Sequence, residues 1–174
     1  MNHIVLFEPE IPQNCGNIMR TAIATNSTLH LIKPLGFSID DKELKRSSVN
    51  YTHDFSFYLY NSFNEFMEKN QGGAYIFLTR YGLKKPSDLS YSDTTKDYYF
   101  IFGKESTGLP LDILKEHIDT CVRFPMSKNV RALNLSNTVC AMIYEALRQQ
   151  DYPDLSIFEP EEFKGKNHIL DEEN

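Results

Sequence analysis

The sequence predicts an α/β domain in which a mainly parallel sheet is flanked by helices. Short apolar runs alternate with helix-like segments along the 174 residues, the pattern of repeated strand–helix–strand units. Some runs are continuously apolar, as in Ile4-Val5-Leu6-Phe7, which is typical of parallel strands buried on both faces. Ligands of such sheets bind at loops beyond the carboxyl ends of the strands, so a functional site is expected there.

The expected elements follow from apolar runs and from residues that start or stop helices. The expected strands are His3–Phe7, Leu29–Ile32, Phe55–Tyr60, Ala74–Leu78, Tyr98–Phe102 and Thr120–Phe124. The expected helices are Asn14–Thr25 after a loop, Asp40–Ser47, a segment capped by Asn61 or Ser62 and running to about Asn70, Pro110–His117 and Ser136–Gln149. The last helix has an apolar stripe through Val139, Met142, Ile143 and Leu147, which predicts a buried face.

Length and composition favour one soluble, cytoplasmic domain. A chain of 174 residues that is 41% hydrophobic can bury a single full core. No apolar run approaches a membrane span, and the start Met1-Asn2-His3-Ile4 lacks the basic and apolar segments of a signal peptide. The three cysteines form no Cys-x-x-Cys pair and the five histidines show no ligand spacing, so no metal is expected.

Charge is unevenly distributed along the chain. The formal net charge is −6, which disfavours a general nucleic-acid binder. Residues 159–174 contain six acids against Lys164 and Lys166, so most of the negative charge lies in an acidic tail, 153–174, that follows a single domain, 1–152. Lys42, Lys45 and Arg46 would gather on one helix face, as a basic patch or as an ordinary solvated surface.

Three loops rich in glycine or polar residues follow strand ends, and the first is Asn14-Cys15-Gly16-Asn17-Ile18-Met19-Arg20. Gly16 would permit a tight entry into the helix. Asn14 or Asn17 could cap that helix, and its free N–H groups could bind a phosphate. Arg20 would lie about one turn inside the helix. It could be a functional residue or an ordinary arginine in a surface ion pair.

The second loop is Phe102–Pro110, in which Gly103 and Gly108 would let the backbone approach a ligand closely. Glu105 could orient an RNA hydroxyl or a partner side chain, or cap a neighbouring helix. The loop lacks the Gly-Lys-Ser/Thr ending of a phosphate-binding loop, and the chain has no Gly-x-Gly-x-x-Gly fingerprint. Neither ATP hydrolysis nor dinucleotide binding is therefore indicated.

The third loop is Arg123-Phe124-Pro125-Met126 followed by Val130–Asn137. Asn134 and Ser136 are both suited to cap the following helix. Ordinary capping explains either residue alone, but not the clustering of Asn134, Ser136 and Asn137 in one turn.

In this order and spacing the three loops resemble the SPOUT superfamily of RNA methyltransferases. The likeness is greatest to the YibK-like tRNA (cytidine/uridine-2′-O)-methyltransferases, which modify the wobble nucleotide, position 34. It covers about residues 1–152 and rests on Asn14–Arg20, Phe102–Pro110 and Asn134–Asn137. The resemblance implies a trefoil knot from about Leu78 to Gln149, although knots are rare. It also implies a homodimer in which each active site is completed by the other subunit.

The resemblance further implies S-adenosylmethionine as the methyl donor, tRNA as the partner, and no membrane. The implied donor contacts are Leu78, Thr79, Gly103, Phe124, Met126, Ala132 and Leu133. Relatives often have serine in place of Ala132, so only backbone contact is expected there. The implied catalytic residues are Arg20, Glu105, Asn134 and Ser136, and the candidates for RNA contact are Asn17, Lys42, Lys45, Arg46 and Arg131.

Arg20 holds the key role in the resembling enzymes, sometimes as the base. Because a guanidinium is essentially always protonated, we expect Arg20 to clamp a phosphate and stabilise the developing 2′-oxyanion instead.

Two other functions remain open: a 2′-O-methyltransferase acting on another tRNA or rRNA site, and a non-catalytic RNA-binding α/β module. A conventional open-sheet methyltransferase is disfavoured because the loop Glu8-Pro9-Glu10-Ile11-Pro12 contains no glycine.

Overall fold

The computed structural model describes residues 1–38 and 57–171 and contains one six-stranded sheet. The strands are β1 (Asn2–Phe7), β2 (Thr28–Ile32), β3 (Phe57–Tyr60), β4 (Ala74–Leu78), β5 (Tyr98–Phe102) and β6 (Cys121–Val122). Their order is β3-β2-β1-β5-β4-β6, and every pair is parallel. The predicted parallel α/β architecture is confirmed.

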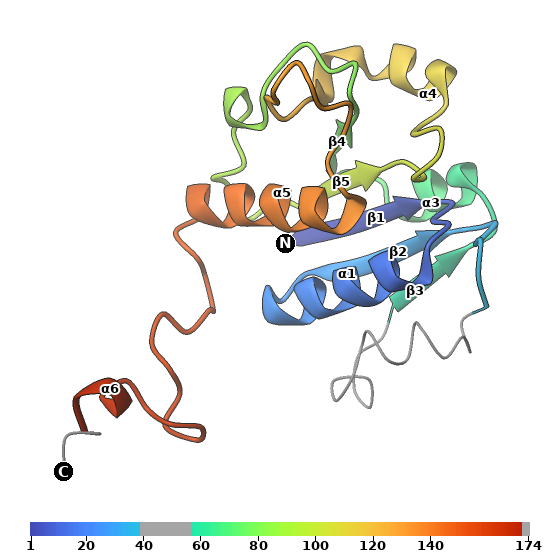
Figure 1. The fold of residues 1–174 in the computed structure, drawn as a ribbon. Coiled ribbons are helices and arrows are strands. Elements are labelled where there is room, and N and C mark those ends of the chain that lie inside the picture. The colour runs from blue at the N-terminus through green and yellow to red at the C-terminus, as the bar shows by residue number, and fades with distance from the viewer. Residues whose placement is uncertain (39–56, 172–174) are drawn as a thin grey trace.

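Helices cover both faces of this sheet (Figure 1). The helices are α1 (Pro12–Ala24), α3 (Phe63–Lys69), α4 (Leu111–Glu116), α5 (Leu135–Gln149) and α6 (His168–Asp171), with single 3₁₀ turns at Pro86–Asp88 and Ile118–Thr120. Side chains of α1 and α5 share one buried cluster, and those of α3 and α4 share another. Neither α1 nor any other helix within the described ranges is both long and apolar enough to cross a membrane.

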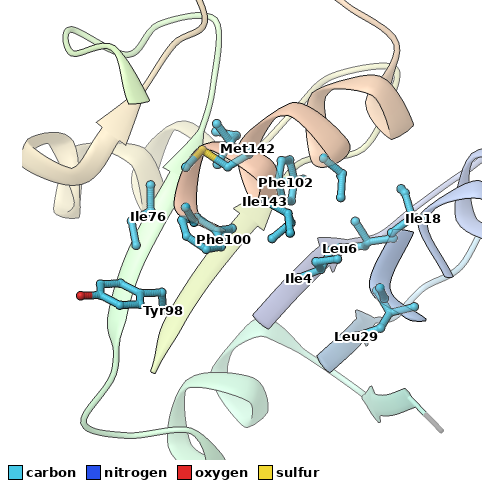
Figure 2. Close-up of a cluster of buried hydrophobic side chains, with 14 of the residues drawn as sticks. Ile4, Leu6, Ile18, Leu29, Ile76, Tyr98, Phe100, Phe102, Met142 and Ile143 are labelled. Atoms are coloured by element: carbon cyan, nitrogen blue, oxygen red, sulfur yellow. The ribbon is translucent and has the colours of Figure 1, made fainter. Parts of the chain in front are cut away.

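Alternating side chains along each strand supply the two halves of the core. Ile4 and Leu6 point to the face covered by α1 and α5, whereas Val5 and Phe7 point to the other. Figure 2 shows Ile18 of α1 beside the strand residues and Met142 and Ile143 of α5 over Phe100 and Phe102. Each such side chain contributes roughly 1.5–3 kcal/mol when fully buried, so both helices are fixed against the sheet.

Most predicted elements are found near their expected positions. β4 and β5 have the predicted bounds, Ser62 caps α3 by accepting from Glu65 N, and all four residues of the predicted α5 stripe are buried. Pro110 is the N-cap of α4 rather than a first-turn residue. β6 is shorter than the predicted Thr120–Phe124 strand. The predicted helix Asp40–Ser47 lies outside the described residues.

The start of α1 differs from the expectation. The helix begins at Pro12, with Ile11 as its N-cap, so Asn14, Gly16 and Asn17 lie inside the helix and cap nothing. Proline is favoured at the first helical position because its missing N–H would have no partner there and its φ is already helical. Asn14 is thereby buried in the first turn of α1 and available for contacts with distant loops.

The strand order brings several loops to one edge. The arrowheads of β1, β2, β3 and β5 point to the same side in Figure 1, since all pairs are parallel. β1 is paired with β5, which is paired with β4, so the loop before α1 adjoins the loop after β5. The tail after α5 runs away from the sheet and includes α6 (Figure 1).

Candidate active site

A cavity of about 820 Å³ lies at the carboxyl ends of β4, β5 and β6. It is lined by residues 78–81, 102–109, 122–124, 126, 131–135 and 138, with Ile11 and Asn14 from the start of α1. Its size is that of a small-molecule site, and its lining combines apolar side chains with loop backbone. The cavity is therefore the main candidate for binding a ligand.

The seven residues that the family resemblance implies as donor contacts all line this one cavity: Leu78, Thr79, Gly103, Phe124, Met126, Ala132 and Leu133. Leu78 and Phe102 are buried at the ends of their strands and provide apolar surface. Thr79 N donates to Val122 O over 3.0 Å, which ties the ends of β4 and β6 together. Segments distant in sequence thus form one wall.

Position 103 requires glycine because the backbone of Gly108 and Leu109 packs against it. A Cβ at this position would lie 2.3 Å from Gly108 C and 2.4 Å from Leu109 N, too close for any side chain. The loop is closed by a hydrogen bond from Gly108 N to Lys104 O of 2.9 Å, and Gly108 has a φ of +76°. Both glycines therefore shape the wall of the cavity through the backbone.

Glu105 holds the segment that precedes α1. Its carboxylate accepts hydrogen bonds from Glu10 N (2.9 Å), Ile11 N (3.3 Å) and Asn14 Nδ2 (2.9 Å). The carboxylate thereby takes up the N–H groups of Glu10 and Ile11, directly before the helix where the sequence suggested a phosphate. Glu105 is consequently a positioning residue in this structure, because both carboxylate oxygens accept hydrogen bonds from the protein.

Two further carboxylates complete this connection between loops. The Glu10 carboxylate accepts from Ser106 N and Ser106 Oγ, both at 2.8 Å, and these bonds lower the pKa of Glu10. Lys104 Nζ lies 2.6 Å from a Glu8 carboxylate oxygen, and that bond raises the pKa of Lys104. We call residues 8–11 and 104–106 with these contacts the glutamate brace.

Asn134 joins the third loop to the other two. Its Oδ1 accepts from Ser136 N (2.9 Å) and Ser136 Oγ (2.7 Å), so Asn134 caps α5 as expected. Its Nδ2 donates to Asn14 Oδ1 over 3.0 Å. Asn134 therefore reaches Glu105 through Asn14, and Ser136, which donates to Asn134, supports the cap rather than forming it.

The remaining predicted site residues are placed differently. Arg131 lines the cavity and is exposed. Arg20 and Asn17 are exposed on α1 and are absent from the lining of the cavity as the described residues form it. Lys42, Lys45 and Arg46 lie outside the described residues.

Sequence reasoning missed several residues that the structure brings to this site. Asn14 was expected only as a helix cap, and Arg80, Tyr81 and Arg123, which line the cavity, were not assigned a role in it. The Arg80 guanidinium lies 4.7 Å from the centre of the Tyr81 ring, a cation–π pair at the cavity wall. The position of Arg80 and Tyr81 directly after β4 was the available signal, since loops at carboxyl ends of strands form such sites.

The parallel α/β sheet thus carries a cavity made by the loops after its strands, and Glu105 and Asn134 connect that cavity to the first helix. The SpoU rRNA Methylase family model matches residues 1–144, and the chain belongs to this family.

Individual relatives agree with this assignment. A relative from Listeria monocytogenes is 52% identical over 151 residues, covering 87% of this chain and 89% of its own length. The tRNA (cytidine(34)-2′-O)-methyltransferase of Saccharophagus degradans is 42% identical over 151 residues. The alignment covers 86% of this chain and 96% of that relative. A solved structure described as giving insight into 2-OH methylation of C/U34 on tRNA superposes with a TM-score of 0.81 at 38% identity, covering 87% of this chain and 97% of that one.

Proposed function

We propose that this chain is an S-adenosylmethionine-dependent tRNA 2′-O-methyltransferase that acts in the cytoplasm on the ribose of the wobble nucleotide, a cytidine or a 5-modified uridine. The observation that carries the proposal is the cavity shared by the ends of β4, β5 and β6, which is connected to α1 through Glu105, Asn14 and Asn134. The Saccharophagus degradans relative, named a tRNA (cytidine(34)-2′-O)-methyltransferase, aligns with 86% of this chain, which supports the proposal.

The residues lining the cavity fit the proposed methyl donor. Apolar surface from Leu78, Phe102 and Leu133 suits an adenine and an aliphatic chain, and the backbone at Thr79 and Gly103 offers polar groups. The donor would supply an electrophilic methyl group on a sulfonium, which is already an activated leaving group. The protein must then align the ribose and help remove the hydroxyl proton.

Arg20 is proposed to act on the RNA. A permanently charged guanidinium can clamp a phosphate and stabilise negative charge on the 2′-oxygen, but it cannot accept a proton. The proton would pass to a phosphate oxygen or to water. Glu105 would act indirectly, by keeping the start of α1 in place.

A homodimer would bring Arg20 to the site. Arg20 and Ala24 on α1, and Ala141 and Tyr144 on α5, are exposed on two helices that share one buried cluster. Tyr144 is 45% exposed, so a second copy would cover apolar surface here while placing its Arg20 at the neighbouring cavity. The predicted domain 1–152 with a trefoil knot from about Leu78 to Gln149 is part of the same proposal.

The activity is tested with labelled donor and bulk tRNA from a strain that lacks the gene. Wild-type protein should transfer label to the tRNA, whereas Arg20→Ala should transfer none and still bind the donor with nearly unchanged affinity. Wild-type turnover by Arg20→Ala would end the proposed role of this residue. Absence of transfer by the wild-type protein, with donor binding retained, would instead indicate a binding module.

The shared site is tested by mixing two inactive variants. Arg20→Ala retains the cavity, and Gly103→Val retains Arg20 but cannot close the cavity wall. After random exchange of subunits, half of the dimers are mixed and each contains one intact site, so about a quarter of wild-type activity should return. No recovery in exchanged dimers would show that Arg20 acts within its own chain.

A further inference from the structure

A second hollow lies beside the candidate active site, at the carboxyl ends of β2 and β3. It has a volume of about 590 Å³ and is lined by Lys33, Pro34, Leu35, Phe37, Ser38 and Asn61. None of these residues lines the first cavity. The hollow is shallow and open to solvent, so a base and its phosphate can lie against its lining residues rather than inside an enclosed cavity.

The chain segment that lines this hollow also packs on the glutamate brace, through Ile32 and Gly36, which flank the lining residues. Gly36 N donates to Pro9 O over 2.9 Å, and Glu8 N donates to Ile32 O over 3.0 Å. A Cβ on Gly36 would lie 2.7 Å from both Glu10 Cα and Glu10 O, so the two loops touch at van der Waals distance. Because the Glu10 carboxylate is bonded to Ser106, which lines the first cavity, a short chain of contacts connects the loop that lines the hollow to that cavity.

The chemistry of the hollow is that of a nucleotide subsite. Leu35 and Phe37 are half-buried and pack against the main core, which gives the hollow a firmly held apolar and aromatic wall. Lys33 is exposed, and its Nζ donates to Asn61 Oδ1 over 3.3 Å. An ammonium has three N–H donors, so Lys33 retains capacity for an anion. Aromatic surface for a base beside a cation for a phosphate is the combination that single-stranded RNA requires.

We propose that this hollow binds a nucleotide adjacent to the methylated one in the same RNA, with its base on Phe37 and its phosphate at Lys33. The inference rests on the proposed function, since it takes RNA as the substrate. Two neighbouring nucleotides splayed into two pockets would select unpaired loops over helices, because stacked bases in a duplex cannot separate in this way.

The base contact is tested by fluorescence anisotropy with a labelled anticodon stem–loop RNA. Phe37→Leu retains apolar volume but removes the ring, and it should weaken binding about tenfold. Phe37→Tyr keeps the ring and should bind like wild type, which a merely structural requirement for apolar volume would not produce. Phe158→Leu, at an aromatic residue that is 64% exposed in the tail, is the matched control and should leave binding unchanged.

The phosphate contact is tested by the salt dependence of the same binding. Lys33→Gln should reduce the slope of log K against log salt by roughly 0.7–1, the value for one lost phosphate contact. Lys96→Gln is the matched control, because Lys96 is also exposed but lies before β5, at the amino ends of the strands. Donor affinity should be unchanged in all of these variants.

The two levels of the proposal fail separately. Wild-type methyl transfer with unchanged RNA affinity in both Phe37→Leu and Lys33→Gln would overturn the subsite and leave the proposed function intact. Ring-dependent RNA affinity in a protein that transfers no methyl group would support the subsite and overturn the proposed activity. Equal losses in Phe37→Leu and Phe37→Tyr would also overturn the subsite.

Discussion

Asn134 Nδ2 donates a hydrogen bond to Asn14 Oδ1 over 3.0 Å, between residues 120 positions apart. The orientation of both amides follows from their other partners. Asn134 Oδ1 accepts from Ser136 at the start of α5, which leaves its amino group facing Asn14. Asn14 Nδ2 donates to Glu105, which leaves its oxygen facing Asn134. One polar chain therefore connects the three loops around the cavity.

Substitution of Asn134 should separate helix capping from cavity shape. Asn134→Ala removes the cap and should lower the free energy of unfolding by about 1 kcal/mol. Asn134→Ser retains a capping hydroxyl and should cost less, yet both variants lose the bond to Asn14 and should weaken donor binding. Urea unfolding and calorimetric titration with S-adenosylhomocysteine measure the two effects.

Ser62→Ala is the control for this pair, because Ser62 caps α3 on the far face of the sheet. It should lower stability without changing donor affinity. Wild-type donor affinity in Asn134→Ser would contradict the role given to the Asn14 contact.

Glu105→Gln should damage structure rather than remove a base. In the wild-type protein the N–H groups of Glu10 and Ile11 donate to the two carboxylate oxygens of Glu105. Glutamine would place an NH₂ group opposite one of these donors, so the free energy of unfolding should fall by about 1–3 kcal/mol. Residual methyl transfer should retain the wild-type pH profile. Loss of the acidic limb of that profile would instead identify Glu105 as a base, and Glu65→Gln on α3 is the control.

Gly103→Ala should open the cavity wall. Its Cβ would lie 2.3 Å from Gly108 C, and overpacking of this kind costs about 1–3 kcal/mol. Donor affinity should fall with stability, because Gly103 lines the cavity. Gly73→Ala is the control. Gly73 lies just before β4, away from the cavity lining, and its Cβ would lie 2.4 Å from the Tyr99 ring. This variant should therefore lose stability but keep its donor affinity. Equal donor affinity in the two variants would refute the assignment.

Stability should depend on pH through two buried histidines. His30 Nε2 lies 3.0 Å from His3 Nδ1, and His30 Nδ1 lies 2.8 Å from Tyr60 Oη. Burial, followed by the neighbouring His3, lowers the pKa of His30 to about 3, and burial also lowers the pKa of His3. In the unfolded chain His30 binds a proton at the ordinary histidine pKa of 6.5, whereas in the folded protein it stays neutral until about pH 3.

Neutral His30 therefore leaves the folded state at full stability above pH 6.5, the pKa of His30 in the unfolded chain. Stability declines as the pH falls from there toward about 3, the pKa of His30 in the folded protein. Between about pH 7 and about pH 5, the free energy of unfolding should fall by about 2 kcal/mol on account of His30. Urea unfolding at both pH values measures the change. His30→Gln should flatten the dependence, and an equally steep fall in that variant would assign the effect to other groups.

The sheet was largely predictable from sequence because its strands are continuous apolar runs. Ala74–Leu78 is preceded by glycine, and Tyr98–Phe102 is followed by one, so the bounds of β4 and β5 could be read locally. β6 was overextended because its end depends on a distant loop: Arg123 N donates to Lys84 O, and a Cβ on Gly82 would lie 2.4 Å from Val122 C. No local pattern contains that contact.

The candidate site was predictable in part, and mainly through family resemblance. The seven residues assigned to the donor meet at one cavity, although spacing alone gave each loop an ordinary explanation. The role of Asn14 was missed because its partners Glu105 and Asn134 are 91 and 120 residues away. A polar side chain near a helix start suggests capping. Pro12, a residue type favoured at the first helical position, was the local signal that the helix begins earlier.

The central claim is most directly tested by locating the transferred methyl group. After reaction of the wild-type protein with labelled donor and tRNA from a strain lacking the gene, nuclease digestion and mass spectrometry identify the modified nucleotide. The account predicts one methyl group on the ribose 2′-oxygen of the wobble cytidine or uridine. A methyl group on a base, on another tRNA nucleotide, or on rRNA alone would contradict it.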